Sequence, residues 1–290
     1  MAHCDLYSGA VIAVGSMHDK HVAIGKPFAV RLGAELVVPS GLDTDCFGTF
    51  TGEVERYGNM LDAARAKAEL AIEKSGLAYG LGSEGTFGSH PYLPDASADT
   101  ELLVFVDRSR DLFIRDVLIT RRTNYGWFPA RPGGDWSAAL RQLGFPSHGV
   151  VVTPNAQIGR FEPIKGLRDP TDLQFAIEAA ARRSFDGEAR VTSDMRAHMN
   201  PTRMAAIRTL AHRLAIRIQS ICKVCGAPGF GLADLARGLP CAVCKAPTPD
   251  AVAEIHRCAL CKFELIVPFR TRRTAAPSCR CRHCRPPDTP

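Results

Sequence analysis

The chain has almost no cysteine outside its C-terminal end. Of its eleven cysteines, only Cys4 and Cys46 precede residue 222. A disulfide framework is typical of secreted proteins and would spread cysteines through the whole fold. The first residues, MAHCDLYSG, also lack the basic segment and apolar core of a signal peptide. We therefore expect a cytoplasmic protein with reduced thiols.

Long apolar runs are also missing. No stretch approaches the ~20 residues that a membrane-spanning helix needs, so we expect no membrane partner. Apolar residues nevertheless make up 46% of the 290 positions, which is enough for a core. This length predicts one large domain at residues 1–220 and a small domain at residues 221–290.

The C-terminal segment contains four Cys-x-x-Cys pairs. They are Cys222/Cys225, Cys241/Cys244, Cys258/Cys261 and Cys281/Cys284. Two such pairs complete a tetrahedral four-sulfur site, so we predict two structural zinc ions in a zinc-ribbon tail. A catalytic zinc is not expected, because four cysteines leave no position for water. The spacing leaves open whether the pairs combine sequentially, interleaved or nested, and whether Cys279 replaces Cys281.

The positive charge of the chain is concentrated in this tail. From Cys222 onward there are eleven Lys/Arg and five Asp/Glu, a difference of +6 that equals the net charge of the whole chain. The basic residues gather near the end, at Arg270, Arg272, Arg273, Arg280, Arg282 and Arg285. Such a surface could bind nucleic acid. We favour the alternative, in which these residues offset the thiolates, because the tail lacks the interleaved aromatics on which bases stack.

The apolar pattern of the larger domain predicts strands that alternate with helices. This order indicates an α/β fold with a mixed central sheet flanked by helices. Strands are expected near residues 8–15, 34–39, 77–83, 101–122 (a hairpin) and 149–154, and helices near residues 20–32, 60–75, 136–143, 170–184 and 201–219. In the tail, we expect the segment KAPTPDAVAEIHR to form a hairpin between two cysteine pairs.

Two groups of residues in the first half are candidates for a phosphate and metal site. Lys20 follows a glycine turn at the start of a helix, where backbone amides bind anions; the alternative is a solvated lysine. Glu84 follows the strand at 77–83 between glycines, where α/β sheets bind ligands. With Glu53 or Glu55 it could hold magnesium. Asp43 and Asp45 are expected to make turns.

A third candidate lies before the last helix, in the segment SDMRAHMNPTRM. Asn200 and Pro201 are typical of a helix start, as N-cap and first helical residue. Arg196, His198 and Arg203 around this start are suited to binding phosphate. The alternative is that the arginines brace two domains by pairing with acidic groups.

The order of these segments along the chain resembles that of the inosine triphosphate pyrophosphatase superfamily, whose members hydrolyse non-canonical purine nucleoside triphosphates. The matching segments are VIAVGSMHDK with Lys20, GEVERYGNMLDAARAKAELA with Ala64, Lys67 and Ala68, LGSEGTFG with Glu84, and MRAHMNPTR. The resemblance implies that Lys67 also binds substrate. The sequence departs from the family pattern at Ala63, where asparagine usually stands. It also has a single glutamate, Glu84, where the family has paired acidic residues. The whole chain, with its Cys-rich end, also resembles an uncharacterised bacterial family.

Our leading hypothesis is a magnesium-dependent hydrolase of nucleoside triphosphates, in which Lys20, Arg196 and Arg203 neutralise the phosphates. The rival is a non-catalytic module that binds a nucleotide or nucleic acid, and a scaffold for protein contacts is a third option. The tail could serve as a lid, a homodimer contact or a nucleic-acid handle. The hydrolase hypothesis requires Glu84 and the segment at 196–203 to share one cleft with Lys20. If they lie on opposite faces of the sheet, the hydrolase hypothesis fails and the binding module takes its place.

Overall fold

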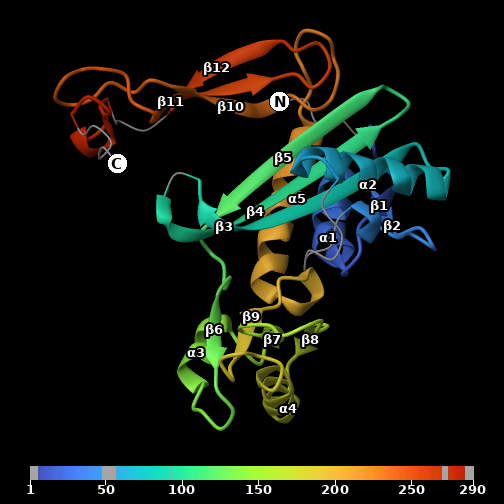
Figure 1. Cartoon of the computed structure of the whole chain (residues 1–290). Helices are drawn as coiled ribbons and strands as arrows, with labels where there is room; N and C mark the ends of the chain where they lie inside the picture. The colour runs from blue at the N-terminus through green and yellow to red at the C-terminus, as the bar shows by residue number, and fades with distance from the viewer. Residues whose placement is uncertain (1–5, 48–56, 92, 270–273, 285–290) are drawn as a thin grey trace.

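The protein consists of a mixed sheet, an antiparallel sheet and a Cys-rich tail (Figure 1). The computed structural model describes residues 6–47, 57–91, 93–269 and 274–284. The prediction of an α/β protein is confirmed, but the described residues before 221 form two sheets where a single mixed sheet was expected. Among the described residues, no helix is long and apolar enough to cross a membrane.

The mixed sheet has the strand order β2-β1-β3-β4-β5. Its strands are β1 (Val11–Gly15), β2 (Glu35–Val37), β3 (Tyr79–His90), β4 (Leu93–Asp107) and β5 (Leu112–Thr120). β1 runs parallel to β2 and to β3, whereas β3, β4 and β5 form an antiparallel meander. Three helices cover the sheet: α1 (Lys20–Leu32), α2 (Met60–Ser75) and α5 (Pro201–Gln219).

Alternate residues of β4 divide the core between the two faces of the sheet. Leu103 and Phe105 pack in a cluster with residues of α1 and α5, whereas Leu102 and Val104 pack with residues of α2. Each fully buried side chain of this kind contributes about 1.5–3 kcal/mol. Helices α1 and α5 therefore cover one face and α2 covers the other.

The predicted helices of this part have the expected ends. Helix α2 begins at a capping box, in which Asn59 accepts from the amides of Leu61 and Asp62, and it ends at Gly76 with φ 71°. Helix α5 begins at Asn200, whose side chain accepts from the amide of Arg203. Local capping chemistry sets these boundaries, which is why the sequence predicts them.

The prediction that a strand ends at Glu84 is wrong. β3 continues to His90, so Glu84 lies in the middle of a strand. The glycines around it serve close packing, and they do not end the strand. A Cβ at Gly82 would lie 1.8 Å from the carbonyl oxygen of Ala64, so this glycine allows the backbone of α2 to approach β3.

The antiparallel sheet is inserted between β5 and α5. Its order is β6-β9-β7-β8, with β6 (Trp127–Ala130), β7 (Val150–Pro154), β8 (Ile164–Leu167) and β9 (Ala189–Ser193). Helices α3 (Ser137–Leu143) and α4 (Pro170–Ala181) accompany it, and its core cluster is separate from those of the mixed sheet. These strands have only four or five residues each, and their pairing depends on long-range contacts that local pattern does not reveal.

The tail forms a three-stranded antiparallel sheet, β10 (Gly231–Arg237), β11 (Ala251–Arg257) and β12 (Glu264–Pro268). The hairpin expected within KAPTPDAVAEIHR is absent; that segment supplies β11, which pairs with β10 and β12. The tail contacts the mixed sheet beside β5, where Ala259 packs against the core cluster. Arg217 of α5 donates to the carbonyl oxygens of Arg115 and Leu232, at 2.8 and 2.7 Å.

Candidate functional site

The eight paired cysteines converge into two groups of four. Site 1 contains Cys222, Cys225, Cys258 and Cys261, and site 2 contains Cys241, Cys244, Cys281 and Cys284. The pairs therefore combine in an interleaved order, first with third and second with fourth, which answers a question that spacing left open. Cys279 is exposed and belongs to neither group.

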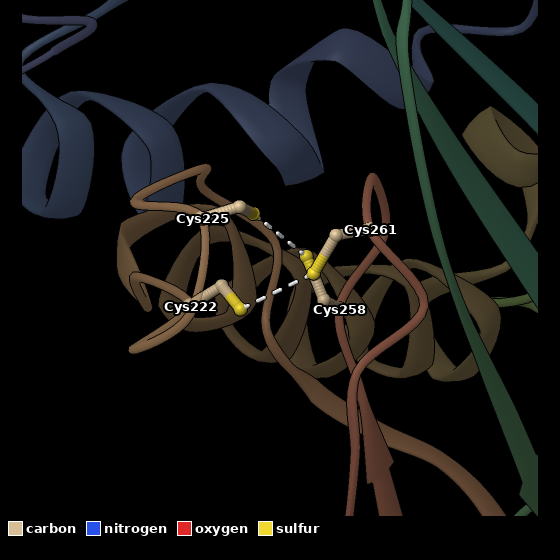
Figure 2. A group of neighbouring side chains, drawn as sticks. All are labelled: Cys222, Cys225, Cys258 and Cys261. Carbon is tan, nitrogen blue, oxygen red and sulfur yellow. Dashed lines mark hydrogen bonds between the residues drawn. The ribbon is translucent and has the colours of Figure 1, made fainter.

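Both groups have the geometry of a tetrahedral metal site. In site 1, Cys222 and Cys261 have sulfurs 3.7 Å apart, and Cys225 and Cys258 have sulfurs 3.6 Å apart (Figure 2). In site 2 the corresponding distances are 3.8 and 3.5 Å. A zinc ion with bonds of about 2.3 Å to sulfur would place its ligands about 3.8 Å apart. The residues therefore fit zinc, in agreement with the predicted structural sites.

The cysteine turns repeat one backbone conformation. The residue after the second cysteine of a pair has a left-handed φ: 73° at Gly226, 62° at Lys245 and 64° at Lys262. Each of these lysines donates to a carbonyl oxygen of its own turn, Lys245 to Ala242 and Lys262 to Ala259. The two ammonium groups are thus held within their own cysteine turns.

The arginines of the basic cluster can be placed only in part. Arg280 forms an ion pair with Asp250 at 2.6 Å. Arg282 is exposed, and the remaining members, Arg270, Arg272, Arg273 and Arg285, lie outside the described residues. The nucleic-acid surface expected at the tail therefore stays a prediction.

A second centre lies where β1 ends. Gly15, the last residue of β1, pairs with Gly82, so β3 continues from Ser83 without this neighbour. We define the buried charge centre as Lys20, Lys67, Ser83 and Glu84. Lys67 of α2 forms an ion pair with Glu84 of β3. Lys20 of α1 donates to the carbonyl oxygen and the hydroxyl of Ser83, at 3.3 and 3.2 Å.

Lys20 is a buried cation. It is only 6% exposed, and within the described part of the chain no carboxylate lies at ion-pair distance from its ammonium group. Burial, followed by the charge of Arg203, lowers the pKa of Lys20 to about 8. The charges of Glu101 and Glu84 act in the opposite direction. The environment therefore disfavours the charged form of this lysine in the absence of a ligand.

The start of α1 leaves its backbone amides without a side-chain cap. The two residues before the helix, His18 and Asp19, have left-handed φ values of 63° and 58°, and Asp19 makes no capping hydrogen bond. Free amides at a helix start carry a partial positive charge. They lie next to Lys20 in sequence, so the site combines two sources of positive potential.

Arg203 lies on the face of the sheet that α1 and α5 cover, opposite to Glu84. Its guanidinium forms an ion pair with Glu101 at 2.5 Å and lies over the ring of Phe87, 5.0 Å from the ring centre. It also donates to the carbonyl oxygen of Met195. A Cβ at Gly85 would lie 2.3 Å from the guanidinium of Arg203, so a larger residue at this position would clash with Arg203.

The condition that the hydrolase hypothesis set is therefore not met. Glu84 is the register partner of Leu102, on the α2 face, whereas Arg203 binds Glu101, on the α5 face. Arg196 is held by Asp194, with the closest nitrogen–oxygen distance 2.6 Å. Both arginines have carboxylate partners, but Asp194 is two residues from Arg196, and Glu101 belongs to the same mixed sheet that Arg203 covers, so neither pair joins two domains.

His198 stands beside His18, and the ring centres are 5.2 Å apart. Burial lowers the pKa of His18 to about 4, and the neighbouring His198 contributes to this shift. Burial, followed by the charge of Arg196, also lowers the pKa of His198. Both imidazoles are therefore neutral at pH 7, and His198 would meet a phosphate as a neutral hydrogen-bonding group.

The other predicted acidic residues do not join Glu84 in the described structure. Glu53 and Glu55 lie outside the described residues, and Asp45 begins a short 3-10 helix ending at Phe47. Sequence reasoning missed Asp99 and Glu101, two buried acidic residues of strand β4. Burial and the neighbouring Glu101 raise the pKa of Asp99 to about 8. Their i, i+2 spacing on a buried strand is the signal that could have revealed them.

A comparison with known protein families identifies the family of this chain. A family model described as a domain of unknown function, DUF6671, matches residues 67–286. The chain belongs to the DUF6671 family. The DUF6671 match includes Lys67, Glu84 and all eight paired cysteines, and it begins after Lys20. Comparison with curated proteins and with solved structures finds no match, so the resemblance to the inosine triphosphate pyrophosphatase superfamily has no support there.

Proposed function

We propose that this DUF6671 protein binds the polyphosphate chain of a nucleoside triphosphate at the buried charge centre. The observation that carries the proposal is the buried ammonium group of Lys20, which has only Ser83 as a hydrogen-bond partner in the described structure. A buried charge without a counter-charge is unfavourable. A phosphate oxygen would supply a direct counter-charge and raise the pKa of the lysine.

Two neighbouring features support an anionic ligand. The uncapped amides at the start of α1 offer hydrogen-bond donors, as helix starts do for phosphate. Lys67 adds a second ammonium group from another helix, although Glu84 neutralises it in the ligand-free protein. A chain of several phosphates suits this site, because its donors come from separate elements along the edge of β3.

The tail has a different task in this proposal. Four cysteine sulfurs leave no open position on a tetrahedral metal, so sites 1 and 2 would hold structural zinc. Site 1 lies near the mixed sheet: a Cβ at Gly229 would be 2.7 Å from the side chain of Ile114. The zinc-stabilised tail would support β5 and the end of α5.

Hydrolysis of the bound nucleotide with magnesium is the second candidate function. Glu84 favours it, because a buried carboxylate beside two lysines could position water or a metal near a phosphate. This version would use Lys20 and Lys67 for the phosphates, in place of Arg196 and Arg203, which are held by carboxylates.

Calorimetric titration of the zinc-loaded protein with ATP, GTP and ITP tests the proposal. The Lys20→Met variant should bind at least about tenfold more weakly, because a charge-assisted hydrogen bond contributes about 1.5–3 kcal/mol. Lys26→Met, at an exposed position of the same helix, is the matched control and should bind normally. Equal affinity in both variants would refute the site. Phosphate and pyrophosphate release in the same samples reports hydrolysis separately.

A further inference from the structure

Two buried carboxylates stand on one face of β4. Asp99 and Glu101 are two positions apart, so their side chains point to the same side of the strand. Their register partners on β3 are Phe87 and Gly85. Asp99 is 1% exposed and Glu101 is 0% exposed. The strand thus carries two acidic groups into the protein interior, next to Arg203.

Only one of these carboxylates has a cationic partner. Glu101 accepts from Arg203 through both of its oxygens, at 2.5 and 3.4 Å. Neither oxygen of Asp99 has a hydrogen-bond donor among the described residues, although both oxygens are buried. Burial and the neighbouring Glu101 raise the pKa of Asp99 to about 8, so Asp99 is largely protonated at pH 7 in the ligand-free protein, and a bound cation would favour its carboxylate form.

This pair belongs to the same electrostatic neighbourhood as the buried charge centre. The charge of Lys20 acts on Asp99, and the charge of Glu101 acts on Lys20. Three basic groups (Lys20, Lys67 and Arg203) face three acidic groups (Glu84, Asp99 and Glu101) in this neighbourhood. With Asp99 protonated, the three positive charges exceed the two remaining negative charges by one. A bound polyphosphate would give this group of side chains and ligand a strongly negative total charge, and a divalent cation would offset that charge.

We propose that Asp99, beside Glu101, supplies a carboxylate ligand to a divalent cation of the magnesium class, which binds together with the polyphosphate. The inference rests on the proposed nucleotide binding and names a metal ligand of that site. Magnesium is commonly held by one or two carboxylates, with phosphate oxygens and water completing its shell. Asp99 suits this task better than Glu84, because Lys67 already occupies the Glu84 carboxylate.

The test compares nucleotide affinity with and without a divalent cation. In the zinc-loaded full chain, magnesium or manganese should strengthen ATP binding by about tenfold or more, as a charge-assisted contact would. Asp99→Asn should abolish this enhancement and leave metal-free ATP affinity nearly unchanged. Asp116→Asn, on the neighbouring strand β5, is the control and should keep the enhancement. Asn is nearly isosteric with Asp, and thermal unfolding of each variant checks the fold.

A second measurement follows the metal itself. In electron paramagnetic resonance, the free manganese signal should fall when ATP-loaded wild-type protein is added, by more than ATP alone explains. The Asp99→Asn protein should remove less manganese. Equal enhancement by metal in wild type and Asp99→Asn would overturn the inference and leave nucleotide binding standing. Absence of ATP binding by the wild type, with or without metal, would overturn both proposals.

Discussion

The Cys-rich tail and the buried charge centre differ in how far apart their parts lie along the chain. Each cysteine turn is made within five residues, and its backbone conformation recurs from one turn to the next. The buried charge centre draws Lys20, Lys67 and Glu84 from two helices and a strand. Chemistry encoded locally can be read from spacing, whereas chemistry assembled by topology becomes visible only when the sheet is known.

A related contrast exists within the tail. Site 1 includes the turns at Gly229 and Ala259, which contact the mixed sheet. Site 2 includes the turn at Cys241, which bridges to Ala276 within the tail. We therefore expect site 1 to stabilise the larger domain and site 2 to stabilise the tail alone.

The largest expected effect is the loss of a zinc site. Cys258→Ala should reduce the zinc content from two ions to one and unfold site 1, because structural zinc contributes about 10 kcal/mol or more in small sites. Elemental analysis measures the metal. Cys279→Ala, in the same tail but outside both sites, is the control and should retain both ions.

The contrast between the two zinc sites can be tested with the same measurement. Cys258→Ala should lower the thermal stability of the mixed sheet, whereas Cys281→Ala in site 2 should not. Hydrogen exchange of amides in β5 and α5 reports this difference directly. If both variants leave these amides equally protected, the tail is an independent attachment.

Breaking the ion pair of Arg203 and Glu101 should have the next largest effect on stability. Its side chains are 3% and 1% exposed, so Glu101→Gln should lower the free energy of unfolding by about 3–5 kcal/mol. The exposed pair of Arg65 and Glu69 offers a matched control, and Glu69→Gln should cost less than about 0.5 kcal/mol. Urea unfolding measures both. Equal losses of unfolding free energy in the two variants would mean that the buried ion pair of Arg203 stabilises the fold no more than a surface pair does.

The sequence predicts the tail better than the rest for physical reasons. Cysteine spacing and the caps at Asn59 and Asn200 act within a few residues, so two metal sites and the helix starts are predictable. The sequence predicts too early an end for the strand that contains Glu84, because glycine occurs at sites of close packing as well as in turns. The antiparallel sheet and the charges of Asp99 and Glu101 depend on neighbours that are distant in sequence.

Replacing Lys20 should stabilise the ligand-free protein. A lysine whose pKa lies near 8 in the folded state and near its ordinary value when unfolded opposes folding at pH 7. Lys20→Met removes this opposition and should raise the free energy of unfolding by about 1–3 kcal/mol. Urea unfolding at pH 7 measures the gain. A loss of stability would mean that the ammonium group is well compensated in the folded protein.

The smallest expected effect is a dependence of nucleotide affinity on pH. Lys20 is charged below its pKa of about 8, so affinity should be full near neutral pH and fall as the pH rises through 8. Lys20→Arg keeps the charge at higher pH and should remove this decline. Titrations between about pH 7 and pH 9 show the difference. An equal decline in both proteins would assign it to another group.

The titration of the Lys20 ammonium group by nuclear magnetic resonance tests the central claim most directly. The measurement follows the labelled lysine with and without tripolyphosphate, and the Lys20→Arg variant assigns its signal. We predict a pKa near 8 in the free protein and a marked rise when tripolyphosphate binds. A pKa near the ordinary lysine value of about 10.4 that tripolyphosphate leaves unchanged would contradict a buried anion site at Lys20.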